Sequence, residues 1–380
     1  MRPVLVLILH PAAPAGAGPL VRALAEARRA LAGRQRAAFL HAGADAVEVV
    51  AGPPDGLSFG ERLAAVAAVA RGEQGGAPRT GGAPGGLIVL GSGSIALATA
   101  ADLRRFVDAA AGPGGHALAN NLYSADVVAI SRAVDLAGLP PLPADNALPR
   151  WLEERAGVAV TDLRSRWRLG VDVDTPLDLI VLRDPAARGL LAAAPLVGER
   201  LAALAEVLSN RRAELLLAGR VSATTLKWLE RGVACRVRAL VEERGLRAAS
   251  RLAQDGTTTG SRPPRSVLGE LLDRDGPAAL AAAVARLAEA AVIDTRVLMA
   301  HRAGAVDVAA SGSQGAGWPP AEDRFASDLL LHDAVADPWL RALTASAAQA
   351  PSDRPILLGG HTLVNGGLRL LAQRALAEAR

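Results

Sequence analysis

The chain has 380 residues, enough for two domains of about 100 to 200 residues each. Hydrophobic residues make up 51% but aromatic residues only 3%, so we expect a core of Ala, Leu and Val and no aromatic surface that stacks single-stranded nucleic acid. The 42 basic and 38 acidic residues leave a net charge of +4. Because Lys227 is the sole lysine, the basic residues are nearly all Arg, which fits a GC-rich coding bias at least as well as phosphate binding. We therefore expect no nucleic-acid partner.

Apolar runs such as Val4–Leu9 are far shorter than the roughly 20 residues of a membrane-spanning helix, so no membrane partner is expected. The same run predicts a buried first strand rather than a signal peptide. Cys235 is the sole cysteine, which excludes an internal disulfide and a thiolate zinc cluster. The cytoplasm is the default location.

The first half alternates strand and helix patterns, which is typical of an α/β domain with a mostly parallel sheet flanked by helices, of Rossmann type. Periodicity predicts an exposed Gly/Pro-rich loop over 72–86 and a helix from a cap at Asp145-Asn146 to Arg155. The remaining predicted strands are 4–9, 46–50, 87–90 and 127–130, and the remaining helices are 20–31, 59–70 and 100–111. This domain is expected to span 1–190.

The second half, 191–380, is dominated by Ala/Leu/Arg patterns and is predicted to be a mainly α-helical C-terminal domain. Helices are expected over 196–208, 223–230 and 278–291, with loops over 254–264 and 311–320. A strand over 356–358 and a helix over 363–379 end the chain, so one strand is expected beside the helices or added to the first sheet.

The turn Gly91-Ser92-Gly93-Ser94 joins a buried strand to a helix. Glycines let a backbone approach a ligand, and N–H groups near a helix start can bind phosphate. The turn is equally compatible with a plain tight turn, because the third glycine of a dinucleotide fingerprint is missing. The helix that follows carries a predicted capping box, Thr99 with Asp102.

Two carboxylates, Asp172 and Asp174, alternate along one strand end and could hold Mg²⁺ or Mn²⁺ with several waters. The alternative is structural: Asp174 caps a helix that begins at Thr175-Pro176, and Asp178 favours its first turn. Both interpretations can hold together.

The segment 120–126 contains the only tyrosine of the chain among amides, hydroxyls and a carboxylate. Such a cluster suits a sugar, a base or a phosphate, although Asn-rich loops are also ordinary turns. Its polar members are Asn120, Asn121, Tyr123, Ser124 and Asp126.

In this order, the segments resemble the nucleotide-diphospho-sugar transferase superfamily, with its GT-A-like fold, over roughly residues 1–185. The runs 59–63, 87–94 and 99–103 are similar to the "FGERL", strand-"GSDSP" and "LTAADL" stretches of the 2-phospholactate guanylyltransferase and related families. The run 172–179 is similar to the "DxDTPEDL" ending of many nucleotidyltransferases, and it is the more specific match.

The resemblance implies a protein that binds a nucleoside triphosphate or nucleotide-sugar with Mg²⁺ and transfers a nucleotidyl group to a small phosphorylated or hydroxylated acceptor. Asp172 and Asp174 would hold the metal, and Arg22 would take the place of a lysine in activating phosphate. We predict substrate contacts from Gly91, Ser92, Gly93, Ser94, Asn120, Asn121, Tyr123, Ser124, Asp126, Asp145, Asn146 and His361.

The sequence departs from the family at two places. Gly93 stands where the family has a metal-binding Asp, and residues 10–19 lack the family's "GGxGTR" stretch. Two alternatives therefore stay open: a catalytically degenerate protein of the same fold that binds or senses a nucleotide or assembles with a partner, and a nucleotide-sugar-dependent glycosyltransferase.

Polar residues of the second half are placed in apolar surroundings. Arg, Asp and His side chains from separate segments could converge on a ligand, or could form an internal ion-pair network. They are Asp294, Arg296, His301, Asp323, Arg324, Asp328 and His361. Cys235 is interpreted as a packed thiol, with a nucleophile as the alternative.

Overall fold

The structure is a computed structural model that describes residues 3–52, 63, 85–132, 139, 142, 147–242, 265–304 and 317–378. The predicted helix over 59–70, the cap at Asp145-Asn146 and the loops over 72–86, 254–264 and 311–320 lie wholly or largely outside these residues. The described residues form two compact units, one from 3–16 and 25–172 and the other from 17–24 and 173–378. The division falls after Asp172, because α5 (Pro176–Leu182) and α6 (Ala187–Ala193) pack with helices of the second unit. The boundary expected from the sequence was after residue 190.

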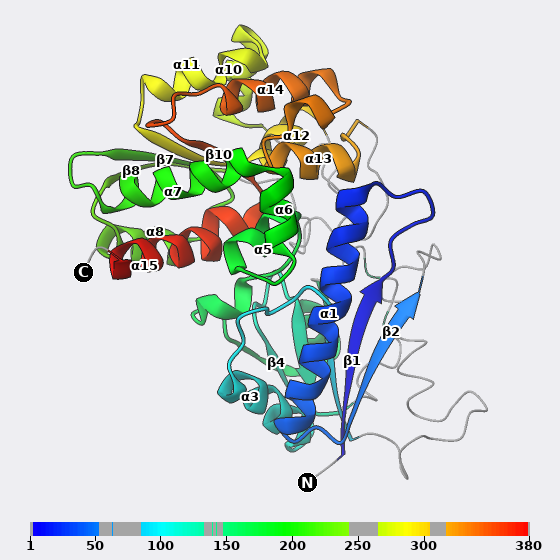
Figure 1. The fold of residues 1–380 in the computed structure, drawn as a ribbon. Coiled ribbons are helices and arrows are strands. Elements are labelled where there is room, and N and C mark those ends of the chain that lie inside the picture. The colour runs from blue at the N-terminus through cyan, green and yellow to red at the C-terminus, as the bar shows by residue number, and fades with distance from the viewer. Residues whose placement is uncertain are drawn as a thin grey trace. The chain divides into compact units, whose positions relative to one another are not determined.

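The first unit is built on a mixed six-stranded sheet with the order β2-β1-β3-β5-β4-β6. The pairs β1–β2, β1–β3 and β4–β6 are parallel, and β5 runs antiparallel to both of its neighbours. Figure 1 shows the strands with α1 alongside β1. The elements are β1 (Val4–Pro11), α1 (Pro19–His41), β2 (Ala46–Gly52), β3 (Gly86–Gly91), α3 (Ala100–Ala111), β4 (His116–Ala119), β5 (Val127–Ile130), α4 (Leu148–Glu154) and β6 (Ala159–Asp162).

Alternation along β1 sends side chains into two cores, one on each face of this sheet. Val6 and Ile8 pack with Phe39 of α1 and Phe106 of α3. On the opposite face, Leu7 belongs to a cluster that includes side chains of α4. Both faces are therefore covered, which explains the apolar runs Val4–Leu9 in β1 and Leu87–Leu90 in β3.

The second unit contains a four-stranded, fully parallel sheet with the order β10-β9-β7-β8. Its strands are β7 (Glu214–Gly219), β8 (Arg236–Val241), β9 (Ala290–Asp294) and β10 (Ile356–Gly359). Helices form most of this unit, as the sequence predicts, but they cover a sheet of which only β10 was anticipated. The fold class is therefore α/β in both units.

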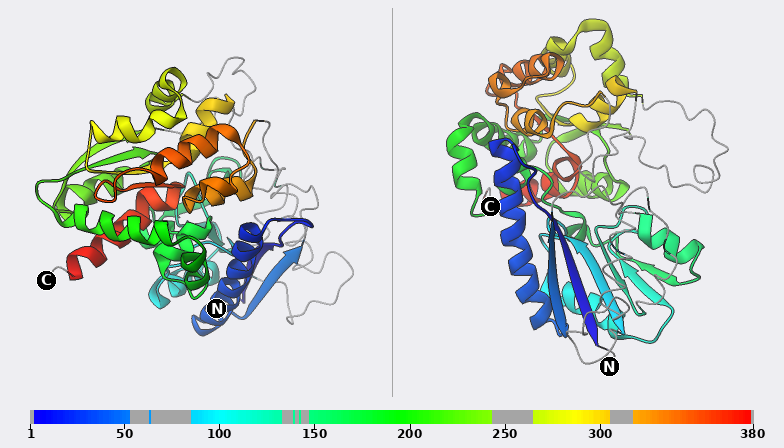
Figure 2. Two further views of the ribbon diagram at one scale, coloured as in Figure 1. Left: turned by 45° about the horizontal axis from the view of Figure 1, so that its top comes forward. Right: turned by 90° about the vertical axis from the view of Figure 1, so that its right-hand side faces the viewer.

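Helices lie on both faces of the second sheet, as the two views of Figure 2 show. One face is covered by α10 (Val267–Asp275), α11 (Leu280–Ala285), α12 (Thr295–Ala303), α13 (Ala321–Asp328) and α14 (Pro338–Ala348), which share one hydrophobic core with the strands. On the other face, α7 (Pro195–Ser209), α8 (Ala223–Gly232) and α15 (Leu368–Glu378) contact one another and the sheet.

The predicted helix over 278–291 is wrong in its second half. The structure has α11 at Leu280–Ala285 and then the strand β9, to which Ala290 and Ala291 belong. An Ala-rich run favours a helix by propensity, but burial on both faces of a parallel sheet overrides it. The strands β4 and β6 were not predicted, because β4 has no β-branched residue and β6 is an edge strand without a fully buried side chain.

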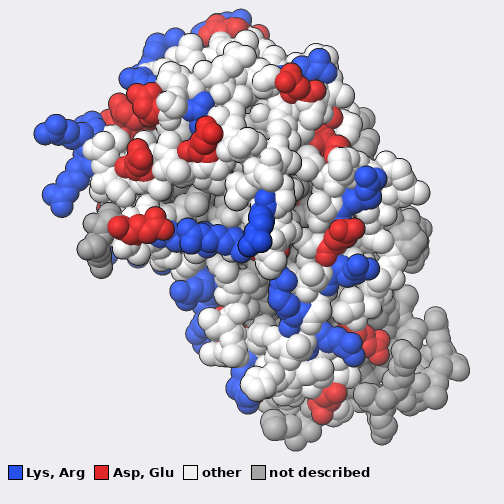
Figure 3. Space-filling view, viewed as in Figure 1, with Lys and Arg blue, Asp and Glu red and all other residues white. Residues whose placement is uncertain are grey.

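On the face drawn in Figure 3, acidic side chains lie among the basic ones. Among the described residues, no helix is both long and apolar enough to cross a membrane.

Candidate functional site

The first candidate site lies where β1 and β3 of the first unit end. After β1 the chain forms β2 on one side of β1 and then crosses to form β3 on the other side. The carboxyl ends of β1 and β3 are therefore a topological switch point, the place where open α/β sheets bind ligands. His10, near the end of β1, and Ser92, directly after β3, are both buried there. His10 Nδ1 and Ser92 Oγ are 3.0 Å apart. Ser92 was predicted from the sequence as a site residue, but His10 was not; its signal is a histidine at the end of an apolar strand.

Burial lowers the pKa of His10, and Arg28 and Arg29 lower it further. The ring is therefore neutral at pH 7 and has one nitrogen that can accept a proton. A neutral histidine against a serine hydroxyl can hold or move a proton at the edge of the sheet.

The predicted turn and a predicted metal ligand meet at this site. Ile95, at the end of the turn, has a positive φ of 46°. Its N–H donates to Asp172 Oδ1 at 2.8 Å, across 77 residues of chain. Asp172 is buried, so its carboxylate is fixed against the turn that the sequence singled out.

Most polar backbone atoms of this turn already have partners within the first unit. Ser92 N donates to Leu9 O at 2.9 Å, and Ser94 N donates to Gly91 O at 3.0 Å. Gln35 Nε2 donates to Ser94 O at 2.6 Å. The turn is consequently held in one shape, and the N–H groups of Ser92 and Ser94 are engaged inside the protein.

Asp174 lies in the second unit and is exposed, whereas Asp172 lies in the first unit and is buried. The predicted cap at Asp174 is wrong by one residue. Thr175 is the N-cap of α5 and forms a capping box with Asp178, whose Oδ2 accepts from Thr175 N at 2.7 Å and from Asp174 N at 2.9 Å. A threonine hydroxyl reaches the N3 amide from the N-cap position, whereas Asp174 is one residue too early.

Burial of Asp178, together with the neighbouring carboxylate of Asp174, raises the pKa of Asp178 to about 7. The capping box predicted at Thr99 and Asp102 for α3 is confirmed. There the bonds from Thr99 and Arg166 outweigh the opposing effect of burial and lower the pKa of Asp102.

The cluster at 120–126 is bonded mainly to itself. Asn120 Oδ1 accepts from Asp126 N at 2.9 Å, and its Nδ2 donates to Asp126 Oδ2 at 2.9 Å and to Leu169 O at 2.8 Å. Asn121 Oδ1 accepts from Tyr123 N at 3.0 Å. These bonds shape the loop, and Tyr123 itself is 59% exposed. Ser124 is half-buried beside it.

Arg22, the predicted phosphate-activating residue, belongs to the second unit and donates to the carbonyl of Ala17. The N-terminus of α1 beside it is occupied by Glu322 of α13. Glu322 Oε1 accepts from Leu20 N at 2.9 Å and Oε2 accepts from Val21 N at 3.1 Å. A carboxylate of the chain itself therefore takes the position at the helix N-terminus that a phosphate could take.

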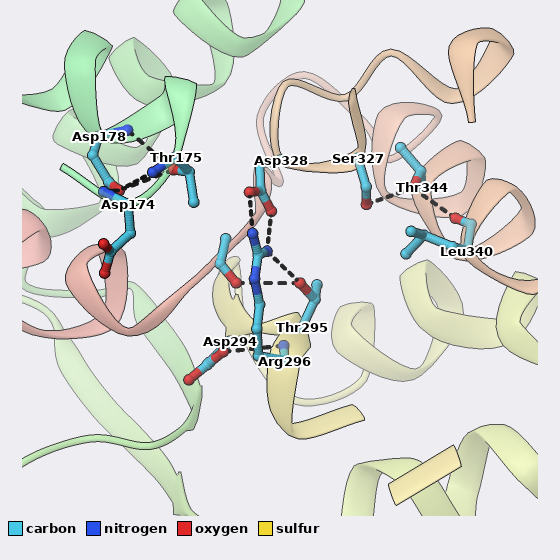
Figure 4. A network of polar contacts seen from close by, with 11 residues as sticks. Asp174, Thr175, Asp178, Asp294, Thr295, Arg296, Ser327, Asp328, Leu340 and Thr344 are labelled. Atoms are coloured by element: carbon cyan, nitrogen blue, oxygen red, sulfur yellow. Dashed lines mark hydrogen bonds and ion pairs between the residues drawn. The ribbon is translucent and has the colours of Figure 1, made fainter. Parts of the chain in front are cut away.

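The second candidate site lies where the parallel strands of the second unit end, and Figure 4 shows its centre. Arg296 and Asp328 are both buried and form a bidentate ion pair, with Arg296 Nη2 at 2.7 Å from Asp328 Oδ2. Burial opposes the charge on Arg296, but Asp328 outweighs it and raises the pKa of Arg296. Of the two interpretations left open for these residues, the contacts favour the internal ion pair.

Asp294 ends β9 at the switch point between β7 and β9 and is fully buried. Its Oδ1 accepts from Arg296 N at 3.1 Å, while its Oδ2 has no hydrogen-bond partner. Gly219, at the end of β7, has a φ of +126°, and a Cβ there would stand 2.3 Å from Asp294 Cβ. The backbone of β7 can approach Asp294 this closely only because residue 219 is glycine.

Asn365 joins two of these strand ends. It lies in the π-helical turn Leu363–Gly367, and its Oδ1 accepts from Ser222 N at 2.8 Å and from Thr225 Oγ1 at 3.0 Å. Its Nδ2 donates to the carbonyls of Arg220 and His361, both at 3.0 Å. The loop of the predicted contact residue His361 is thereby tied to the loop after β7. The glycine pair that follows Asn365 is the one sequence signal for this unusual turn.

Glu270, Asp273 and His301 form the one group of at least three potential metal ligands found in the described part of the chain. His301 Nδ1 accepts from Ser266 N at 3.0 Å, so the ring proton lies on Nε2, which donates to Asp273 Oδ2 at 3.0 Å. A metal needs a lone pair on Nε2, and this tautomer has none there. The group is therefore a structural histidine–carboxylate contact.

Cys235 is buried, and burial raises the pKa of its thiol to about 11. A thiol that stays protonated at pH 7 is a poor nucleophile, in agreement with the packed role expected from the sequence.

Comparisons of the chain with protein-family models, with curated proteins and with solved structures found no match.

Proposed function

We propose that the first unit binds a nucleoside triphosphate or nucleotide-sugar at the carboxyl ends of β1 and β3, and that the protein transfers the nucleotidyl group to a small phosphorylated or hydroxylated acceptor. The contact between Asp172 and Ile95 carries this proposal, because it places a buried carboxylate on the turn at the switch point of the sheet. The resemblance of this turn and of 172–179 to nucleotidyltransferases supplies the reaction class.

The donor set fits a magnesium ion held together with a nucleotide. Mg²⁺ is commonly bound by one or two carboxylates and the phosphates of the substrate. Asp172, whose Oδ1 accepts from Ile95 N, is the carboxylate of this site that would hold the ion. When bound, the ion would neutralise negative charge at the phosphates. The other carboxylate singled out in the sequence, Asp174, lies in the second unit, so the proposal rests on Asp172.

His10 and Ser92 give this site a proton relay of its own. The neutral imidazole can take the proton of an acceptor hydroxyl, with Ser92 holding the ring in place at 3.0 Å. Displacement at the α-phosphate needs the acceptor oxygen deprotonated and in line with the leaving group.

The test is metal-dependent nucleotide binding by isothermal titration calorimetry, using the four nucleoside triphosphates and common nucleotide-sugars with Mg²⁺, Mn²⁺ or EDTA. Asp172→Asn keeps an oxygen for Ile95 N but removes the charge, so we expect at least about a tenfold weaker metal-dependent affinity. Asp108→Asn, at an exposed position of the same unit, is the matched control and should bind as the wild type does. Equal affinities in all three proteins, or no binding by the wild type, contradict the proposal.

Turnover separates the reaction classes. Release of pyrophosphate from a triphosphate indicates nucleotidyl transfer, whereas release of a nucleoside diphosphate from a nucleotide-sugar indicates glycosyl transfer.

A second candidate function, nucleotide binding without turnover, is favoured by one specific observation. Gly93 stands where the resembling family has a metal-binding carboxylate. Gly93→Asp is expected to tighten Mg²⁺-dependent nucleotide binding if the site is otherwise complete. Saturable binding with no pyrophosphate release in either protein favours this second function.

A further inference from the structure

A cavity of about 310 Å³ opens between the start of α15 and one face of α8. Thr224, Lys227, Trp228 and Arg231 follow the spacing that places side chains on a single helix face. Arg369, in the first turn of α15, completes the wall. This volume is at the lower end of the roughly 300 to 1,000 Å³ typical of small-ligand pockets.

Three cations and no acidic residue line this cavity. Lys227 and Arg231 are exposed and stand four residues apart, where like charges destabilise a helix. Neither side chain has an ion-pair partner in the described part of the chain. Arg231 lies in the last turn of α8, where the helix dipole favours a cation. The dipole does not account for Lys227, so Lys227 and Arg231 together bring a surplus of positive charge that an anion would neutralise.

Trp228 supplies a rigid apolar wall. A Cβ at Gly232 would lie 2.5 Å from the Trp228 ring, so the ring packs directly on the glycine backbone. The guanidinium carbon of Arg369 lies over the ring, 4.9 Å from its centroid. This cation–π contact keeps Arg369 at the cavity wall.

From these contacts we propose that the cavity binds a small organic phosphate, whose phosphate group contacts Lys227, Arg231 and Arg369 and whose apolar part rests against Trp228. Arginine suits phosphate oxygens by bidentate hydrogen bonds, and lysine adds a point charge. The site lies wholly in the second unit and shares no residue with the nucleotide site proposed above.

The test uses the full chain and phenyl phosphate as the probe, with phenol and inorganic phosphate as partial probes, in titration calorimetry at low salt. The variant Lys227→Gln/Arg231→Gln is compared with Arg211→Gln/Arg212→Gln, which removes two exposed charges elsewhere in the same unit. We expect wild type and control to bind phenyl phosphate with a Kd of about 1 mM or tighter, and the cavity variant to bind at least about tenfold more weakly.

Trp228→Leu tests the apolar wall separately. It should weaken phenyl phosphate binding while leaving the affinity for inorganic phosphate unchanged, and Asp172→Asn should bind phenyl phosphate as the wild type does. The proposal is overturned if the wild type fails to bind phenyl phosphate, if the cavity variant and the control bind it equally, or if an acidic peptide of glutamates binds the cavity and phenyl phosphate does not.

Discussion

Replacing Asp178 by Asn should change the pH dependence of stability in a defined direction. The raised pKa, about 7 against an ordinary value of 3.8, means that the folded chain keeps a proton on Asp178 that the unfolded chain releases. Between these two values the native state binds more protons, so the contribution of Asp178 is complete below pH 3.8 and is lost as the pH rises toward 7. The folded and unfolded pKa values differ by about 3 units, and one unit is worth about 1.4 kcal/mol, so Asp178 changes the free energy of unfolding by about 4 kcal/mol over this pH range.

The side chain introduced by Asp178→Asn retains an oxygen that can accept from the N–H groups of Asp174 and Thr175, and it carries no charge. The free energy of unfolding of Asp178→Asn, relative to the wild type, should therefore rise by about 4 kcal/mol from pH 4 to pH 8. Urea unfolding followed by circular dichroism at several pH values measures it.

Asp102→Asn is the matched control, because Asp102 holds the same position in the capping box of α3 but has a lowered pKa. The stabilisation from Asp102 is present above the unfolded pKa and lost as the pH falls through the folded one, so this variant should lose stability relative to the wild type at neutral pH. A difference between Asp178→Asn and the wild type that stays constant from pH 4 to pH 8 refutes the reasoning.

Three further predictions concern the second unit. Gly219→Ala should cost about 3 kcal/mol or more, since its Cβ has no room and its φ is +126°, whereas Gly16→Ala, also at positive φ but with nothing within 4 Å, should cost only about 1 kcal/mol in the same urea assay. Asp328→Asn should cost about 3 to 5 kcal/mol by leaving the buried Arg296 charge without its partner, and a loss below about 1 kcal/mol contradicts the buried ion pair. Cys235 should react with a thiol reagent only after unfolding, and fast labelling of the native protein contradicts its burial.

Local signals in the sequence predicted much of the first sheet. The strands β1, β2, β3 and β5 carry apolar runs with clear ends, and the Thr99–Asp102 capping box is readable from spacing alone. The short strands β4 and β6 depend on their partners in the sheet rather than on their own sequence. Propensity therefore left them unassigned.

The second sheet was largely missed because β7 and β9 are short apolar segments among Ala- and Leu-rich helices, and β8 is a partly exposed strand with two arginines. Segments of this kind do not differ in periodicity from a buried helix. Only β10, flanked by Pro355 and a glycine pair, was marked by turn residues.

Contacts between segments far apart in the chain could not be predicted from the sequence either. Alternation placed Asp172 and Asp174 on one face of a strand, yet the chain divides between them, and Asp172 turns to Ile95 instead. His10 and Asn365 show their roles only when strands far apart in the chain are brought together.

The hydrogen bonds of Asn365 bear on chemical ageing of the protein. Asn365 is followed by Gly366, and an asparagine before glycine readily loses ammonia by cyclisation when its backbone is free to bend. The π-helical turn holds this backbone rigid, so the amide is protected while the protein is folded. In an unfolded molecule water would then open the cyclic imide to aspartate or isoaspartate, and on refolding a carboxylate oxygen of the aspartate would face the carbonyl oxygens of Arg220 and His361. Time spent unfolded at alkaline pH should therefore reduce the fraction of molecules that can refold.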